Sequence, residues 1–201
     1  NRNLTPRMAA LSSGKPYWFT CSECKHDFKK SLDRISRQEW CMYCSHHKLC
    51  DDNDCSLCFD ISFASSDKAK YWHPTKNRNL TPRMVTSSSA KPYWFTCSEC
   101  KHDFKKKLDA IKRGGFCMYC SHQSLCDSDD CDYCFHNSFA SIDSSKLWDL
   151  TRNEGLTPRM FGKYSDKHRW FTCQYCDIPF KSTISNITCG QGCPKRYVCS
   201  A

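Results

Sequence analysis

The 201-residue sequence lacks two features, and each absence narrows the range of functions. No apolar run approaches the 18 or so residues that a membrane-spanning helix requires, so we expect no membrane partner. Neither an HxE nor an HExxH motif is present, and no general base is placed by sequence beside a cysteine cluster. Catalytic zinc sites depend on such groups, so we expect a non-enzymatic protein without a small-molecule substrate.

Cysteine, in contrast, is abundant, with 19 residues. An odd number cannot pair completely into disulfides within one chain, and repeated CxxC pairs favour metal binding over disulfides. We therefore expect a reducing, intracellular setting. Three Asn-x-Thr triplets, at Asn3, Asn79 and Asn186, are the opposing signal, because a secreted protein could be glycosylated there. Such triplets arise often by chance.

Two CxxC pairs with 16 residues between them occur twice. This spacing is typical of a structural zinc site, because each pair forms a tight turn that presents two thiolates to a tetrahedral metal. The predicted ligands are Cys21, Cys24, Cys41 and Cys44, then Cys97, Cys100, Cys117 and Cys120, and in a shortened third copy Cys173, Cys176, Cys189 and Cys193. Redox-active or disulfide-bonded cysteines are the alternative.

The chain is a tandem repeat. Leu4-Thr-Pro-Arg-Met8 returns at Leu80 and Leu156, which gives a period of 76 residues. The predicted repeats are 1–76, 77–152 and 153–201, the last truncated or atypical. A unit of this size rarely buries enough apolar surface to be stable alone, so a metal staple is expected.

Local patterns predict a small metal-stapled α+β fold. The aromatic run 16–21 and the alternating run 25–30 indicate a β-hairpin, and Leu32 and Ile35 indicate a short helix that packs on it. Thr5-Pro6 and its two counterparts predict an N-cap and the first residue of a short helix. We expect Trp18, Trp94 and Trp170 to pack as core, the alternative being an exposed platform for nucleic-acid bases.

Two further recurring features concern the joints between repeats. Arg7, Arg83 and Arg159 follow the Thr-Pro motif in every copy, and a structural role is favoured over phosphate contact. The segment from Ser62 to Trp72 recurs from Ser138 to Trp148. It predicts a connector that docks aromatic side chains onto the next repeat.

A second cysteine cluster follows the first in two of the copies. Its members are Cys50, Cys55 and Cys58, and then Cys126, Cys131 and Cys134. His46 and His122 are candidate fourth ligands because they stand four residues before the first cysteine, and His26 and His102 are the rivals. Cys199 could begin such a cluster in the third copy. Three to five Zn²⁺ ions per chain are therefore expected.

The net charge of +9 invites a nucleic-acid interpretation, but zinc-bound cysteines are thiolates. Three four-cysteine sites would leave about +3, and 19 thiolates on five zinc ions about zero. Basic residues nevertheless gather in the hairpin and helix of each repeat. The predicted nucleic-acid-binding residues are Lys29, Lys30, Arg34 and Arg37, and Lys105, Lys106, Lys107, Lys112 and Arg113.

Each repeat combines Leu-Thr-Pro, a Trp-Phe-x-Cys-x-x-Cys-x-His-x-Phe knuckle and Cys-x-Tyr-Cys. In this it resembles the "probable zinc-ribbon" repeat family, which is treble-clef-like and expanded as tandem copies in large DNA viruses. The resemblance implies zinc at the first-cluster cysteines. The sequence departs from the family pattern at Met42 and Met118, where proline is common, and at Cys189-Gly-Gln-Gly-Cys193.

Zinc ribbons serve as nucleic-acid binders and as protein-docking modules, so both functions follow from the resemblance. We favour nucleic-acid binding. The alternative is a structural or protein-docking component, such as a virion- or capsid-associated protein. A viral protein of this kind would be found in the host cytoplasm or in the virion.

Overall fold

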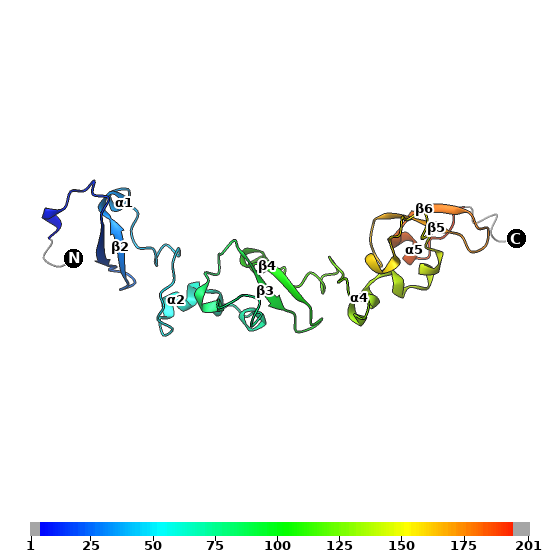
Figure 1. Cartoon of the computed structure of the whole chain (residues 1–201), viewed down its shortest axis with the longest axis horizontal. Coiled ribbons are helices and arrows are strands. Elements are labelled where there is room, and N and C mark those ends of the chain that lie inside the picture. The colour runs from blue at the N-terminus through cyan, green and yellow to red at the C-terminus, as the bar shows by residue number, and fades with distance from the viewer. Residues whose placement is uncertain (1–4, 195–201) are drawn as a thin grey trace. The chain divides into compact units, whose positions relative to one another are not determined.

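The computed structural model describes residues 5–194 and repeats one arrangement three times, an antiparallel hairpin followed by a short helix (Figure 1). The predicted small α+β fold is confirmed, because hairpins form at all three places where the sequence indicates them. They are β1 Pro16–Thr20 with β2 Asp27–Ser31, β3 Pro92–Thr96 with β4 Asp103–Lys107, and β5 His168–Thr172 with β6 Pro179–Thr183.

Short helices follow and connect the hairpins. The α-helices are α1 Leu32–Ser36, α2 Ser56–Ile61, α3 Leu108–Lys112, α4 Asp132–Asn137 and α5 Ile184–Thr188. The 3-10 helices are η1 Pro6–Met8, η2 Phe63–Ser65, η3 Ala69–Tyr71, η4 Pro82–Met84, η5 Phe139–Ser141, η6 Asp143–Leu147 and η7 Pro158–Met160. Within residues 5–194, no helix has the length and apolar character needed to cross a bilayer.

The Thr-Pro motifs begin η1, η4 and η7 as predicted, with proline in the first turn. Thr5, Thr81 and Thr157 occupy the predicted N-cap positions, but their hydroxyls accept no capping hydrogen bond from the described residues. The fixed φ of proline and its missing N–H are sufficient to start so short a turn.

The hairpins have an inner and an outer face because successive strand residues alternate. On the inner face of the second hairpin, Phe95 lies opposite Phe104 and both are buried. On the outer face, Trp94 lies opposite Lys105. The expectation that Trp18, Trp94 and Trp170 pack as core is therefore wrong. Trp18 is 51% exposed, and the other two, at the same place in their hairpins, are partly exposed.

The helix that follows each hairpin packs through apolar residues three apart, as predicted. Leu108 and Ile111 are buried in α3, and Ile184 and Ile187 in α5. Their counterparts in α1, Leu32 and Ile35, are only half-buried. The first hairpin is therefore covered less completely than the later two.

The connectors dock aromatic side chains onto the next hairpin, which confirms that prediction. The buried ring of Phe63 lies 5.6 Å from that of Phe95, and Trp72 lies 5.0 Å from Tyr93. The Phe63 N–H donates to the carbonyl of Val85 at 2.8 Å, which holds the connector backbone in place. The core around a later hairpin is thus completed by the connector before it.

The second connector repeats this arrangement around Phe171. The rings of Phe139 and Trp148 lie 5.9 Å and 5.7 Å from it. These three side chains belong to one buried cluster with Phe161 and Ile184.

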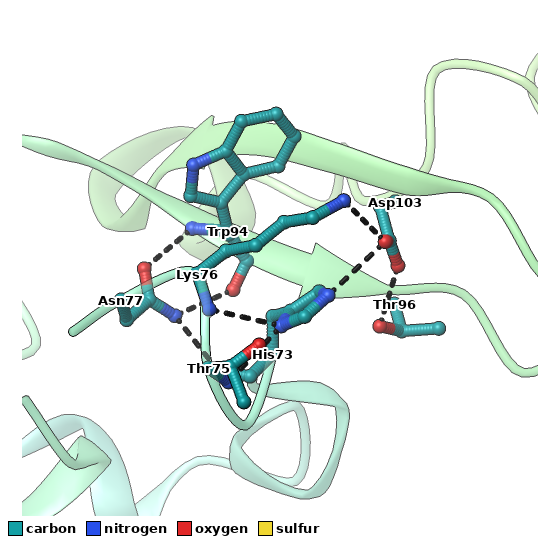
Figure 2. A network of polar contacts seen from close by, with 7 residues as sticks. All are labelled: His73, Thr75, Lys76, Asn77, Trp94, Thr96 and Asp103. Atoms are coloured by element: carbon teal, nitrogen blue, oxygen red, sulfur yellow. Dashed lines mark hydrogen bonds and ion pairs between the residues drawn. The ribbon is translucent and has the colours of Figure 1, made fainter. Parts of the chain in front are cut away.

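At the edge of β3, an asparagine side chain makes the two backbone hydrogen bonds that a neighbouring strand would make (Figure 2). Asn77 Oδ1 accepts from the Trp94 N–H at 2.8 Å, and its Nδ2 donates to the Trp94 carbonyl at 2.8 Å. Asn153 makes the same pair of bonds to Trp170. These bonds satisfy the backbone N–H and carbonyl of the tryptophan at the edge of the hairpin.

Figure 2 also shows an ion-paired network beside this asparagine. His73 Nδ1 accepts from two backbone N–H groups, so the ring proton lies on Nε2 and is donated to Asp103 at 3.0 Å. Lys76 Nζ lies 2.6 Å from the same carboxylate. Burial raises the pKa of Asp103, but hydrogen bonds from Lys76 and Thr96 outweigh that effect and lower it.

The third repeat keeps a hydrogen bond between a threonine and a carboxylate, but the carboxylate comes from a different position. Pro179 stands where the second repeat has Asp103, and Asp149 stands where it has His73. Asp149 accepts directly from the Thr172 hydroxyl at 3.2 Å. The acid thus moves from the hairpin to the residue that follows the connector.

The chain divides into two compact units. One comprises the described residues up to Thr96 together with Asp103–Phe116, and the other comprises Cys97–His102 and the described residues from Cys117 onward. Both joints described above therefore lie within single units. The repeat boundaries at residues 76 and 152 remain a prediction from the sequence.

We expect Phe63→Ala to loosen the second hairpin, because it removes a buried ring from the joint. The free energy of local opening at β3 should fall by about 3 kcal/mol, measured by hydrogen exchange of the zinc-loaded chain. Phe59→Ala is the control, since Phe59 is 43% exposed nearby. Equal protection of β3 in the two variants would show that the connector does not stabilise the hairpin.

Candidate metal centres

The first knuckle forms where the chain leaves the first strand of each hairpin. Cys21 follows β1, and its carbonyl accepts from the Lys25 N–H at 3.0 Å. Lys25 has a φ of 59°, the left-handed conformation that reverses the chain. This turn brings Cys21 and Cys24 to one side, where Cys41 and Cys44 meet them.

The predicted first clusters assemble in both full repeats. Cys21, Cys24, Cys41 and Cys44 form one group, and Cys97, Cys100, Cys117 and Cys120 form the other. The Sγ atoms of Cys21 and Cys44 are 3.6 Å apart, and those of Cys24 and Cys41 are 3.4 Å apart. The corresponding pairs in the second repeat are both at 3.5 Å.

The second clusters also assemble, but with the rival histidines. His26 joins Cys50, Cys55 and Cys58, and His102 joins Cys126, Cys131 and Cys134. His26 Nε2 lies 3.4 Å and 3.7 Å from the Sγ atoms of Cys55 and Cys58. In the second repeat, the distances from His102 to Cys131 and Cys134 are 3.3 Å and 3.4 Å.

The choice of His46 and His122 as fourth ligands is therefore corrected. Both residues have positive φ, 60° and 55°, and both are exposed. They close the turn after the second knuckle rather than continuing a helix, so the four-residue spacing to the next cysteine does not place them on its face. His26 and His102, two residues after a first-knuckle cysteine, lead into the second strand instead.

Tyrosines from the second knuckle support these histidines. The Tyr43 ring stacks on His26 at 4.3 Å, and Tyr119 stacks on His102 at 4.2 Å. Each tyrosine stands between two first-cluster cysteines. The stacked pair therefore links the first and second clusters of a repeat.

The spacing of the donor atoms fits zinc. A tetrahedral ion with Zn–S bonds of about 2.3 Å and Zn–N bonds of about 2.0–2.1 Å places its sulfur atoms roughly 3.8 Å apart and a sulfur and a nitrogen roughly 3.6 Å apart. The observed separations are close to both values. A disulfide would need about 2.05 Å between sulfurs. The clusters are consistent with zinc binding, and a bound ion would staple the hairpin to its knuckles.

Neighbouring donors favour the thiolate form of the leading cysteine in each second cluster. Burial raises the pKa of Cys50, but hydrogen bonds from His26, Cys58 and Arg83 outweigh it and lower the pKa to about 6. Cys126 has a pKa of about 6, where burial is outweighed chiefly by the hydrogen bond from His102. A thiolate is the form that binds metal.

The third copy differs from the prediction at one ligand. Cys173, Cys176 and Cys193 come together, whereas Cys189 is exposed and is not part of the group. Cys189 caps the end of α5, and Cys193 stands 76 residues after Cys117. Cys193 is thus the equivalent of the first cysteine of the second knuckle. Cys199, which was predicted to begin a second cluster in this copy, lies outside the described residues.

A sequence signal for this assignment was present. Pro194 follows Cys193, and proline after that cysteine is the family pattern from which Met42 and Met118 depart. The strict 76-residue offset gives the same alignment. Cys189 stands 76 residues after Arg113, which is not a ligand.

The arginine of the Leu-Thr-Pro-Arg-Met motif donates to the second cluster of the preceding repeat. Arg83 Nη2 donates to Cys50 Sγ at 3.5 Å and to the Asp52 carbonyl. Arg159 Nη2 donates to Cys126 Sγ at 3.7 Å and to the Ser128 carbonyl at 2.7 Å. Both arginines are partly buried, in agreement with the structural role favoured for them.

Some of the predicted basic residues are engaged within their own repeat. Lys30 donates to the Trp40 carbonyl at 2.9 Å, and Arg34 lies 3.5 Å from Glu39. Arg113 pairs with Asp109 at 3.3 Å. Lys106 is partly buried. The exposed cations that remain are Lys29, Arg37, Lys105, Lys107 and Lys112.

Comparison with known proteins agrees with this construction. The family model described as "Probable Treble clef zinc finger domain" matches residues 1–47, 68–123 and 145–200. An uncharacterized protein of Acanthamoeba polyphaga mimivirus is 35% identical over 144 residues, which cover 71% of this chain. The chain spans only about a third of that protein's length, 34%. The similarity predicted from the knuckle motifs, including its link to giant viruses, is confirmed.

We expect five zinc ions per chain by native mass spectrometry under reducing conditions, one for each group of cysteines. The double variant His26→Ala, His102→Ala should retain three, because each second cluster loses a ligand. The double variant His46→Ala, His122→Ala is matched in residue type and should retain five. Loss of zinc from this second pair alone would contradict the ligand assignment.

Replacing Arg83 should weaken metal binding without removing a ligand. Hydrogen bonds to a metal ligand typically contribute about 10-fold or more in affinity. We therefore expect the first zinc ion to dissociate from Arg83→Gln at a chelator concentration about tenfold lower than the wild type requires. Arg7→Gln is the control because Arg7 is exposed. Identical release curves for the two variants would limit Arg83 to a backbone contact.

Proposed function

The chain belongs to the probable treble clef zinc finger family, and on this premise we propose that it is a non-enzymatic zinc-binding repeat protein that binds nucleic acid through the outer faces of its hairpins. The zinc clusters hold each hairpin in shape. The hairpins present the binding residues.

The observation that carries the proposal is a tryptophan–lysine pair repeated on the three outer faces. Trp18 lies opposite Lys29, Trp94 opposite Lys105 and Trp170 opposite Lys181 in the strand register. The lysine Nζ atoms lie 4.9 Å, 5.0 Å and 6.0 Å from the centres of the rings. All three lysines are exposed.

Such a pair offers two kinds of contact to a nucleic acid. An exposed indole can stack on any base, which is worth about 1–3 kcal/mol per base. The adjacent ammonium group can reach a phosphate of the same strand. Trp18 is 51% exposed and Trp94 and Trp170 are partly exposed, so each ring keeps surface for stacking, and its recurrence in all three copies favours a role in binding.

The later repeats add a second cation beside the ring. Lys76 Nζ lies 4.9 Å from the Trp94 ring centre, and Arg152 lies 5.5 Å from that of Trp170. Both come from the segment that follows the connector. The charge near each tryptophan is therefore positive even though the carboxylate of Asp103 or Asp149 lies close to that cation.

For nucleic-acid binding, the charge on the outer faces matters more than the net charge of the chain. With zinc bound, a four-cysteine cluster contributes about −2, and a cluster with three cysteine ligands, with or without a histidine, about −1. Loading all five groups lowers the formal charge from +9 to about +2. The thiolates lie in the clusters, whereas the lysines lie on the outer faces.

Thiolate clusters of this kind require a reducing compartment. We accordingly propose an intracellular setting, the host cytoplasm or a virion where the source is viral. The competing role is a structural or protein-docking component of a virion.

The test removes one lysine from every outer face. We expect the triple variant Lys29→Gln, Lys105→Gln, Lys181→Gln to bind a labelled 20-nucleotide single strand at least tenfold more weakly at about 50 mM salt. Its log K against log salt slope should be shallower by about 2, since each phosphate contact contributes about 0.7. Fluorescence anisotropy between about 50 and 200 mM salt measures both quantities.

The matched control removes the same charge elsewhere. Lys15, Lys91 and Lys167 also occur once per repeat and are exposed, so Lys15→Gln, Lys91→Gln, Lys167→Gln changes the net charge equally. Equal losses in the two triple variants would reduce the effect to net charge. No affinity of the wild type for the single strand or for a duplex would overturn the proposal and favour the docking role.

A further inference from the structure

An apolar groove of about 160 Å³ lies open beside the first hairpin. Thr5, Pro6, Ala9 and Leu11 form one wall, and Tyr17, Phe19 and Leu32 form the other. Leu11 is 74% exposed, and Tyr17, Phe19 and Leu32 are half-buried. These apolar side chains are therefore left accessible to solvent in the first repeat.

The same groove is filled in the second repeat. Tyr93, Phe95 and Leu108 are the counterparts of Tyr17, Phe19 and Leu32, and all three are buried. Phe63 and Trp72 of the connector pack against Tyr93 and Phe95. Phe95 and Leu108 are each 0% exposed.

The third repeat is filled in the same way. Phe139 and Trp148 pack against Phe171, and Ile184 takes the place of Leu32. Phe171 and Ile184 are each 0% exposed. The chain therefore shows the same interface twice, with the same two aromatic side chains nine positions apart.

The backbone of the connector pairs with the segment after the Thr-Pro motif. In the second repeat, the Phe63 N–H donates to the Val85 carbonyl, and the Ser87 N–H donates to the Ile61 carbonyl at 3.0 Å. In the third repeat, the Phe139 N–H donates to the Phe161 carbonyl at 2.7 Å. In the first repeat, Ala9 stands where Val85 and Phe161 stand.

We propose that the groove of the first repeat binds a connector segment of the same kind, supplied by another repeat, with its phenylalanine against Phe19 and its tryptophan against Tyr17. The occupant is a peptide in which phenylalanine and tryptophan stand nine positions apart, as Phe63 and Trp72 do. Its phenylalanine backbone pairs with Ala9. Binding extends the array by joining repeats end to end, independently of any contact with nucleic acid.

The probe is a labelled synthetic peptide with the sequence of residues 59–75, added to the zinc-loaded chain. We expect saturable binding of one peptide per chain, measured by fluorescence anisotropy. Peptides with Phe63→Ala or Trp72→Ala should bind at least tenfold more weakly, because each loses a ring that packs against the hairpin in the second repeat. A peptide with the sequence of residues 135–151 should compete.

Two neighbouring alanines give a matched pair of variants of the chain. Ala9 lines the groove, whereas Ala10 is exposed and does not line it. Ala9→Arg should reduce peptide affinity at least tenfold, and Ala10→Arg should leave it unchanged. Both variants should keep the wild-type zinc count, which shows that they are folded.

Three results would overturn the proposal. They are equal affinity for the two arginine variants, binding of several peptides per chain, and binding that survives both alanine substitutions in the peptide. Concentration-dependent self-association that Ala9→Arg abolishes, without any peptide binding, would also overturn it, because the groove would then pack against a different surface of a second copy rather than against a connector segment. Sedimentation of the wild type and of Ala9→Arg distinguishes that case.

Discussion

Tetrahedral coordination by thiolates is the constraint on which the rest of the structure depends. The strands have five residues and the α-helices five or six, and elements this short are marginal in water without a partner. Cys24 and Cys41 are 17 positions apart and meet at 3.4 Å. A metal ion that closed this loop would supply the stability that the small core lacks, and folding and metal binding would then form one equilibrium.

The second cluster extends this constraint from the repeat to the joint. His26 comes from the hairpin, three cysteines come from the segment at α2, and Arg83 comes from the start of the next repeat. The connector that continues from α2 then buries Phe63 under the following hairpin. The metal cluster, the arginine hydrogen bond and the aromatic core thus follow one another along the chain. Together they hold neighbouring repeats of one unit against each other.

Features with a local signal could be predicted from the sequence. The knuckle spacing, the alternating strands and the 76-residue period indicated the hairpins, the first clusters and the docking connectors. Features that depend on backbone direction could not be predicted in this way. His46 has the spacing of a helical neighbour of Cys50, but its φ of 60° places it in a turn. Trp18 is large and aromatic, but the register that turns Phe19 inward turns it outward. Cys189 and Cys193 were both predicted as ligands, but the 76-residue period aligns only Cys193 with a knuckle cysteine.

The separation of charge follows from the same alternation. Each hairpin has one face committed to the core, where Phe95 and Phe104 pack, and the clusters hold the thiolate charge at its end. On the other face, all three copies place tryptophan with lysine opposite. The third copy has changed its acid from the hairpin to the segment after the connector and lost the CxxC spacing of its second knuckle, while this pair is unchanged. The persistence of the pair through these changes supports the proposed role of the outer faces in binding an external ligand.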